Sequence, residues 1–311
     1  MALPPLSVTA RSCRVLGVAL ALVAPPTARA CSVCACGDPL LDTTDSAAQL
    51  GVLRLQLDAE ALSMDAGSED APGATDRLDQ YTLRGDVVYS PVDRLALVAR
   101  VPLVRKDLRR LGGDGAASDL TGLGDVELGA RWVFFRSVNL GTARMQDLSL
   151  SAGTSLPTGE DGARGPDGAR IDEHGQLGTG AWGPYAGLNY HLDQGRWYAF
   201  ASVSGRVRTT NAFGYRYGSA LLWSAHGQLR PVPRLALDLG VDGRSAGRDS
   251  SDGAAVANTG GLVLAAAPGA FLNVAGPLWI SLRAQLPFYT RLFGDQAVRP
   301  TVTGGVQYQL R

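Results

Sequence analysis

Three closely spaced cysteines are the residues of this sequence best suited to chemistry. Cys31, Cys34 and Cys36 form a Cys-x-x-Cys-x-Cys segment. Thiolates bind soft metals such as Cu(I) or Zn(II), although three ligands do not complete a closed zinc site. In an oxidising compartment two of the thiols would instead form a disulfide and leave the third for redox chemistry, or Cys31 would carry a lipid. Covalent haem attachment is excluded because no histidine follows the second cysteine.

Histidine is the second residue type that could support catalysis. The chain has three histidines, His174, His191 and His226. Ser224 and His226 share one face of an expected strand and are the Ser–His pair that is close in sequence. A hydrolase also needs an orienting partner, and one acting on lipids needs these groups at a membrane surface, whereas both side chains are expected to point inward. We therefore expect no enzyme activity.

A segment rich in carboxylates, GEDGARGPDGARIDEHG, spans residues 159–175. Ca²⁺ takes about six to eight oxygen ligands, so such a segment is a candidate calcium site. The spacing is not that of an EF-hand loop, and the glycines and charges favour a solvated, flexible connection. The sequence therefore predicts an outer loop here and no calcium site.

Composition excludes several classes of protein. The 311 residues include 29 basic and 29 acidic side chains, so the formal net charge is zero, which argues against nucleic-acid binding. Charged residues make up only 19%, there are 39 glycines, and 45% of the residues are hydrophobic. Low charge, many glycines and an ordinary apolar content indicate a β-rich protein with many turns.

Residues 1–30 have the order of a secretory signal peptide. Two arginines precede an apolar run over residues 15–24, and an Ala-Arg-Ala triplet follows. This run is too short for a membrane-spanning helix, which needs about 20 apolar residues. No later stretch is long and apolar enough to span as a helix. Residues 31–49 would then form a periplasmic N-terminal segment, which carries the three cysteines and could dock a periplasmic protein.

A period of two governs the rest of the chain, residues 50–311. Leu53, Leu55 and Leu57 alternate with polar residues, for example. Successive side chains of a strand point to opposite faces, so this pattern gives one apolar and one polar face. Twelve such segments of about ten residues follow one another, and about ten residues are enough for a tilted strand to cross a bilayer. An even number of strands is typical of single-chain bacterial barrels.

The connections between these segments alternate between short and long. Short connections such as residues 91–93 and 193–195 are separated by long ones such as residues 63–80, 105–122 and 158–180. Outer-membrane barrels have short periplasmic turns and longer outer loops. The sequence therefore predicts an all-β fold, a closed antiparallel up-and-down transmembrane β-barrel of about 12 strands in the bacterial outer membrane.

Aromatic residues are predicted at the two ends of the strands, where rings prefer the interface between lipid and water. Such girdles are typical of membrane barrels, whereas strand propensity alone predicts no clustering at strand ends. Outward rings at the periplasmic end are those of Tyr89, Phe134, Tyr190, Trp197 and Tyr308, and those at the outer end belong to Tyr81 and Tyr217.

The inward face of the predicted barrel is charged. Eight arginines and eight carboxylates balance one another there, which predicts a neutral lumen. Such a lumen is either a narrow polar channel or a plug closed by its own Arg–carboxylate pairs. The predicted pore-lining residues are Arg54, Asp58, Glu60, Arg84, Asp86, Arg100, Asp125, Glu127, Arg131, Asp147, Arg206, Arg208, Asp238, Asp242, Arg244 and Arg283.

Three groups of motifs in the middle of the chain are similar to those of a known family. They are Gly122-Leu-Gly-Asp-Val126 followed by Gly129-Ala-Arg-Trp132, then Ser155-Leu-Pro-Thr-Gly159, and then Leu177-Gly-Thr-Gly-Ala-Trp182. Together they resemble the meta-pathway phenol-degradation family of outer-membrane proteins over residues 120–190. The resemblance implies a barrel that transports small organic compounds. The cysteine segment is not part of that pattern, and the chain ends in Tyr308-Gln-Leu-Arg311 where such barrels usually end in an aromatic residue.

Two functions are compatible with these features. The first is an outer-membrane channel or transporter for a small solute, surrounded by lipid. The alternative is a non-transporting barrel whose cysteine segment binds a soft metal, Cu or Zn, or a periplasmic redox partner. No cofactor beyond that metal and no nucleic-acid partner is expected.

Overall fold

Antiparallel β-structure makes up most of the chain described by the computed structural model, which comprises residues 51–67, 75–111, 117–166 and 168–310. The predicted signal peptide and the segment with Cys31, Cys34 and Cys36 lie outside these residues, so their roles stay predictions. Within the described residues no helix is long and apolar enough to cross a membrane. The helices present are two single 3₁₀ turns, η1 (Leu140–Thr142) and η2 (Glu173–Gly175).

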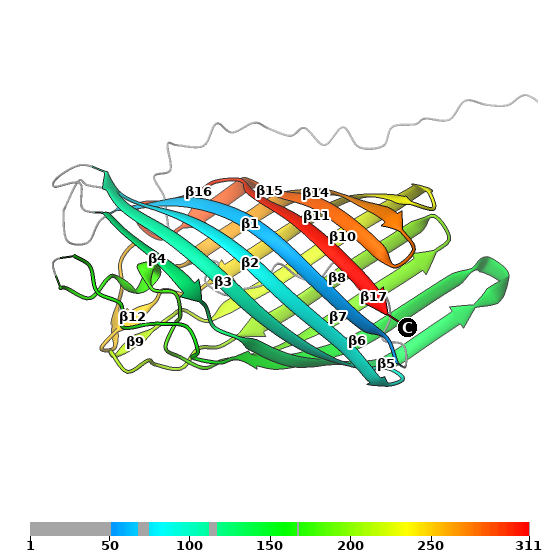
Figure 1. The fold of residues 1–311 in the computed structure, drawn as a ribbon, viewed down its shortest axis with the longest axis horizontal. Coiled ribbons are helices and arrows are strands. Elements are labelled where there is room, and N and C mark those ends of the chain that lie inside the picture. Colours follow the sequence, from blue (N-terminus) through cyan, green and yellow to red (C-terminus); the bar gives the residue numbers. More distant parts are fainter. Residues whose placement is uncertain (1–50, 68–74, 112–116, 167, 311) are drawn as a thin grey trace, which may run out of the picture.

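Twelve strands cross the barrel in the described part of the chain (Figure 1). Two of them are interrupted, because β4 and β5 both pair with β3, and β16 and β17 both pair with β1. The short strands β9 (Tyr215–Arg216), β12 (Ser250–Ser251) and β13 (Ala254–Ala255) form a separate small sheet. The barrel strands are β1 (Leu53–Gly67), β2 (Thr75–Val92), β3 (Leu95–Leu111), β4 (Ala117–Leu123), β5 (Glu127–Asn139), β6 (Arg144–Ser155), β7 (Gly183–Gln194), β8 (Trp197–Arg206), β10 (Ala220–Val232), β11 (Leu235–Ala246), β14 (Gly261–Ala275), β15 (Leu278–Leu292), β16 (Gln296–Val298) and β17 (Thr301–Leu310).

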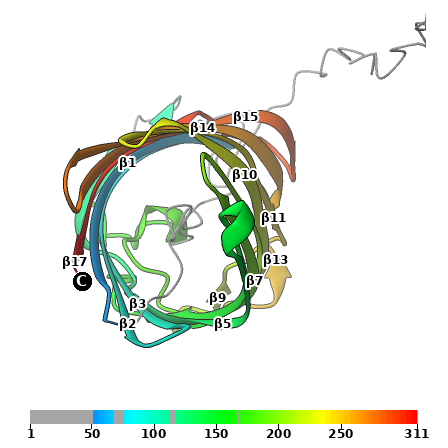
Figure 2. The same cartoon turned by 90° about the vertical axis from the view of Figure 1, so that its right-hand side faces the viewer.

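The last strand returns to the first and closes the sheet. β1 pairs with β2 on one side and with β17 on the other, where Leu53 lies opposite Leu310 and Ala61 opposite Val302. Figure 2 shows the resulting ring, viewed along the barrel. Closure pairs the backbone groups of what would otherwise be two edge strands, which is the condition for a sheet inside a membrane. The predicted closed antiparallel barrel of about 12 strands is confirmed.

Short turns join the strands at one end of the barrel, here called the turn end, and long loops join them at the other, the loop end (Figure 1). Two-residue turns at 195–196 and 276–277 begin with Gly195 and Gly276, whose φ angles of 63° and 50° favour a residue without a Cβ. The C-terminus lies at the turn end. The alternation of connection lengths predicted from the sequence is therefore a property of the fold.

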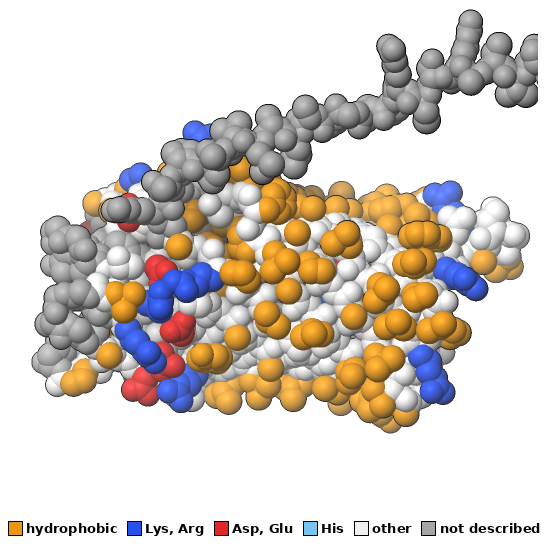
Figure 3. Space-filling model, turned by 90° about the horizontal axis from the view of Figure 1, so that it is seen from above, with side chains coloured by type: hydrophobic (Ala, Val, Ile, Leu, Met, Phe, Trp, Pro, Cys, Tyr) orange, Lys and Arg blue, Asp and Glu red, His pale blue; other side chains and the backbone are white. Residues whose placement is uncertain are grey.

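Side chains alternate between the outer and inner faces of the barrel, as the sequence pattern predicts. On β11, Leu237, Leu239 and Val241 are 47%, 65% and 41% exposed, whereas the neighbouring Ala236 and Asp238 are buried. Figure 3 shows a broad apolar belt with charged side chains at both of its ends. An apolar exterior around a charged interior reverses the arrangement of a water-soluble protein and fits a barrel surrounded by lipid.

The strands are longer at the loop end than the sequence predicts. β2 and β3 have 18 and 17 residues, so much of the predicted loops at 63–80 and 105–122 is strand. Charged side chains replace apolar ones on the outer face there, as in the ion pair of Arg77 with Asp65 at 2.7 Å between β2 and β1. Because the apolar period stops at the edge of the belt, a hydrophobic pattern cannot reveal this part of the strands.

Tyr217 is not an outward interface residue, and that prediction is wrong. β10 begins only at Ala220, and Tyr217 lies in the preceding loop, which turns inward. Its side chain is buried, and its hydroxyl donates to the backbone oxygen of Glu173 at 2.9 Å. By contrast, the predicted interface residues Tyr89 and Trp197 are exposed on the outside.

A positive charge on the outer face near the middle of β11 should be costly. We expect Leu239→Arg to destabilise the barrel in lipid vesicles by about 2–4 kcal/mol, because a cation at that depth must be desolvated. Leu140→Arg is the matched control, since Leu140 is 89% exposed in the turn-end hairpin. Denaturant titrations followed by tryptophan fluorescence measure both free energies of unfolding. Equal effects of the two substitutions would contradict a lipid-facing belt.

Candidate solute pathway

All sixteen charged residues predicted to line the interior are buried or half-buried, and none is exposed. They fall into three groups with different surroundings. One group forms a chain of ion pairs along the wall, one carboxylate anchors a loop, and others have separate partners. Their role in solute passage remains a prediction, but their positions define what the lumen offers to a solute.

Seven of these residues form a continuous chain of ion pairs, here called the luminal ladder. Its members come from β15, β1, β2, β3, β5 and β8, so it runs around a large part of the wall. Each carboxylate lies between two guanidinium groups, which compensates for the burial of its charge. The order of contacts is Arg283, Asp58, Arg84, Asp86, Arg100, Glu127 and Arg206, with N–O distances from 2.6 to 3.9 Å.

The ladder depends on small residues in the wall beside it. The Tyr185 hydroxyl lies against β5 and β6, where a Cβ on Gly129 or Gly153 would come within 2.3 or 2.6 Å of its oxygen. The Arg206 guanidinium stacks over the Tyr185 ring at 5.0 Å and reaches Glu127 at 2.6 Å. Glycine at these inward positions therefore makes room for a long arginine to cross the wall.

The other predicted lining residues include two carboxylates with partners of their own. Asp147 binds Arg136 at 2.9 Å, an arginine that the sequence pattern did not select. Glu60 accepts a long hydrogen bond, 3.5 Å, from the Thr303 hydroxyl. The remaining arginines on the inner face are Arg54 on β1, Arg131 on β5, Arg208 after β8 and Arg244 on β11.

His226 lies between the last two predicted carboxylates. Its Nδ1 is 2.7 Å from Asp238 and its Nε2 is 3.0 Å from Asp242. Gly240 is required beside it, because a Cβ there would lie 2.3 Å from Nδ1. The Ser224 hydroxyl instead contacts that of Ser202 at 3.2 Å. The structure therefore does not bring Ser224 and His226 together as a nucleophile and its base.

Aromatic rings form a second surface on the inner wall, here called the aromatic cluster. His191 stacks on Phe200 with ring centroids 5.0 Å apart and lies 6.2 Å from Tyr198. Arg230 lies over the Tyr198 ring at 5.6 Å. These residues belong to β7, β8 and β10, so apolar rings pack beside charge on this part of the inner wall, with Phe200 and His191 buried.

Loop 156–182 folds into the barrel, so the predicted solvated outer loop at residues 159–175 is wrong. Figure 2 shows green segments inside the ring, and Ile171 and Ala181 are 8% and 2% exposed. Gln176, 1% exposed, holds the turn together because its amide nitrogen donates to the oxygens of Ala163 and Ile171 and its amide oxygen accepts from Ala163 N. One buried amide thus joins the two sides of this turn, next to the buried apolar side chains.

The three motif groups that carry the family resemblance meet at the base of this loop. Asp125, in the break between β4 and β5, accepts hydrogen bonds from Gly159 N at 3.0 Å and from the nitrogen and hydroxyl of Thr179 at 2.8 and 2.6 Å. We call these three residues the Asp125 anchor. Bonds to a buried carboxylate are stronger than neutral ones, so the anchor joins both ends of the loop to the wall.

Close backbone contact tightens the anchor. A Cβ on Gly178 would lie only 2.4 Å from the Gly159 oxygen, so the two ends of the loop touch. The Thr158 hydroxyl accepts from Val126 N at 2.8 Å and donates to the Gly124 oxygen at 3.2 Å, which spans the break in the strand. The loop therefore leaves and re-enters the wall at one place.

The tip of the loop is held against the wall by residues that sequence reasoning missed. Lys106 of β3 donates to the backbone oxygens of His174 and Gln176 at 2.9 and 2.6 Å. It was missed because this part of β3 lies in the predicted loop at 105–122. A lysine with an inward position on the extended strand is the signal that could have found it.

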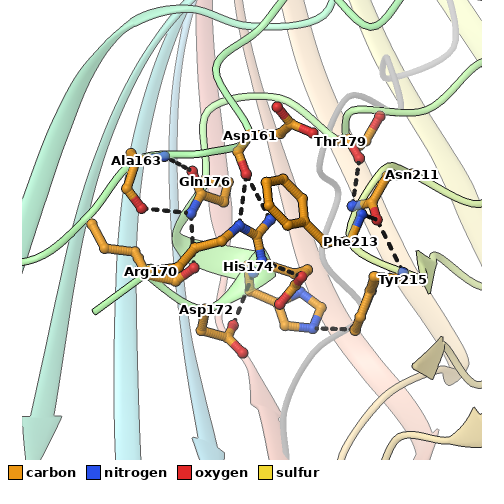
Figure 4. Close-up of polar contacts among 12 residues, drawn as sticks. Asp161, Ala163, Arg170, Asp172, His174, Gln176, Thr179, Asn211, Phe213 and Tyr215 are labelled. Carbon is orange, nitrogen blue, oxygen red and sulfur yellow. Dashed lines mark hydrogen bonds and ion pairs between the residues drawn. The ribbon is translucent and has the colours of Figure 1, made fainter. Parts of the chain in front are cut away.

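Loop 207–219 adds further contacts (Figure 4). Asn211 donates to the Thr179 oxygen at 3.3 Å. The Arg170 guanidinium lies 3.8 Å from the centroid of the Phe213 ring and donates twice to the Asp161 oxygen. These contacts link the inward loop to its neighbour.

Cavities remain between the loop and the wall and beside the ladder. The first is lined by Glu60, Gln80, Arg84, Val104, Leu177 and Tyr217, among others, so it combines charged, amide and apolar groups. The second lies next to Arg131, Asn189 and Arg206. These cavities are large enough for a few water molecules, which would contact polar and apolar groups together.

Removing the charge of the anchor should release the loop. We expect Asp125→Asn to lower the free energy of loop opening by about 1.5–3 kcal/mol, because an amide cannot accept all three hydrogen bonds and its own N–H groups oppose the donors. Amide hydrogen exchange of residues 159–179 measures this. Asp119→Asn, at an exposed position on β4, is the matched control and should change nothing. Unaltered exchange in Asp125→Asn would show that the anchor does not hold the loop.

No protein-family model and no curated protein matches the sequence. Among solved structures, the COG4313 outer membrane channel from Pseudomonas putida F1 is similar with a TM-score of 0.66 and 14% identity, over 88% of this chain and 100% of that chain. The translocator domain of autotransporter NalP from Neisseria meningitidis has a TM-score of 0.49 at 10% identity, over 84% of this chain and 90% of its own. The CymD monoaromatic hydrocarbon channel has a TM-score of 0.42 at 8% identity, over 84% and 88%. The first likeness shows that the chain has the fold of an outer-membrane barrel.

Proposed function

We propose that the protein is a channel of the bacterial outer membrane that passes a small solute. The observation that carries the proposal is the reversed barrel, with an apolar belt outside and the luminal ladder inside. A lumen lined by charged and polar groups can hold water and polar solutes. The cavities beside the ladder support the same function.

Loop 156–182 sets the size of the solute in this proposal. Barrels of about 8 strands are filled by their side chains and those of about 16 are open, so twelve strands leave an intermediate interior. The Asp125 anchor and Lys106 hold the loop inside that interior. Only a small molecule would then pass between the loop and the wall.

Small organic compounds are the solute class that this lumen favours. The half-buried Tyr198 ring of the aromatic cluster offers an apolar surface, and the ladder offers hydrogen-bonding and charged groups. A molecule with a planar body and a polar group matches both. The motifs that build the Asp125 anchor resemble the phenol-degradation family, and that resemblance implies the same class of solute.

Shortening the inward loop tests the channel directly. Because Gly159 and Gly178 touch, residues 160–177 can be replaced by a two-glycine link without moving the wall. In planar bilayers we expect discrete conductance from the natural protein and a several-fold larger conductance from this variant, since pore resistance falls as the cross-section grows. Shortening the hairpin between β5 and β6 at the turn end is the control and should leave conductance unchanged. If both the natural and the shortened-loop barrels stayed silent, the proposed function would be overturned.

A further inference from the structure

The tip of loop 156–182 carries a histidine that contacts two other loops. His174, in η2, lies edge-on to the rings of Tyr215 and Tyr217, with centroids 6.3 and 6.0 Å away. Its Nε2 is 3.3 Å from the Tyr215 hydroxyl, as Figure 4 shows, and 3.5 Å from a carboxylate oxygen of Asp249. Both the imidazole and the carboxylate are largely buried, with 17% and 10% of their side chains exposed. The inward loop is thus joined to loops 207–219 and 247–260 through one titratable ring.

The groups around Asp249 hold its carboxylate in place. One oxygen accepts from the Tyr215 hydroxyl at 2.7 Å, and the other accepts from Gly218 N at 2.6 Å. Burial, together with the nearby Asp249 charge, raises the pKa of Tyr215 above its usual range, so its hydroxyl keeps its proton and remains a donor. The carboxylate of Asp249 is thus held 3.5 Å from the His174 Nε2 by contacts that do not involve the imidazole.

The elements packed against His174 fix its backbone and surround its ring with charged and titratable groups. The backbone at His174 is fixed independently of its ring, because its N–H donates to the Asp172 carboxylate at 2.9 Å and its oxygen accepts from Lys106 at 2.9 Å. The charged and titratable neighbours are Asp172 and Glu173 in η2, Arg170 paired with Glu173, Lys106 of β3, Tyr215 and Tyr217 of loop 207–219, Arg208 above the Tyr217 ring, and Asp249.

We propose that His174 is a proton-operated latch for the inward loop. The protonated ring donates a charge-assisted hydrogen bond to Asp249 and ties the loop tip to both neighbouring loops. The neutral ring gives up that ion pair and leaves the tip to Lys106 and Tyr217. Histidine is the side chain that can change its charge in the physiological pH range, which makes this contact sensitive to acid. The loop therefore holds more tightly in acid than at neutral pH.

Hydrogen exchange tests the latch without any reference to transport. Protection of residues 160–176 is measured in the natural protein and in His174→Gln, and each pair is compared at the same pH so that the chemical pH dependence of exchange cancels. We expect protection to be about tenfold higher in the natural protein at about pH 5.5 and nearly equal at about pH 7.5. Asp249→Asn, which keeps the shape of the carboxylate, should behave like His174→Gln. A difference of the same size at both pH values would overturn the proposal, since it would reflect packing of the ring rather than its charge.

Conductance tests the consequence for passage, which rests on the proposed function. We expect the natural protein to conduct less at about pH 5.5 than at about pH 7.5, and His174→Gln to remove this difference. Asp119→Asn, which changes a titratable side chain at an exposed position on β4 instead, is the matched control and should keep the pH response. Conductance that responds to pH equally in the natural protein and in His174→Gln would contradict the latch and would still support the channel. A silent barrel whose exchange still follows His174 would support the latch and overturn the channel.

Discussion

The acceptance of three hydrogen bonds by one buried carboxylate, Asp125, organises the interior of this barrel. A loop rich in polar residues gains little from hydrophobic contacts when it folds into a lumen. It therefore needs hydrogen bonds strong enough to offset the desolvation of its polar groups. Asp125 accepts such hydrogen bonds at a break in the wall, and Gly159 and Gly178 allow the two ends of the loop to approach it. The contacts farther along the loop, from Lys106 to Asp249, hold the tip of a segment whose base is fixed by Asp125.

Alternation of side chains between the two faces of the wall separates apolar residues from charged ones. Lipid takes the apolar side of each strand, and the charges on the other side compensate one another through a ladder that crosses six strands. Burial of a single charge would be costly, but a carboxylate between two guanidinium groups retains most of its stabilisation. Glycines on β5 and β6 are part of this arrangement, since they leave space for Tyr185 and for the reach of Arg206. Paired charges thus line much of the lumen, beside the aromatic cluster.

The fold could be predicted from the sequence because apolar and polar residues alternate with a period of two wherever the wall contacts lipid. The strand number, the turns and the inward charges all follow from that period. It fails beyond the belt, where the outer side chains of β2 and β3 become charged, and this is why Lys106 was assigned to a loop. The inward course of loop 156–182 could not be predicted either. Its glycines and carboxylates have the composition of a solvated segment, and its position is decided by contacts between residues far apart in the chain, such as Asp125 and Thr179.

The touching ends of the inward loop have an evolutionary consequence. Between Gly159 and Gly178 the chain makes an excursion that begins and finishes at one point, so its length and composition are mechanically decoupled from strand register. Mutations, insertions and deletions there leave the cylinder intact while altering what fills it. Selection can therefore change the segment that fills such a barrel while the surrounding strands are inherited unchanged.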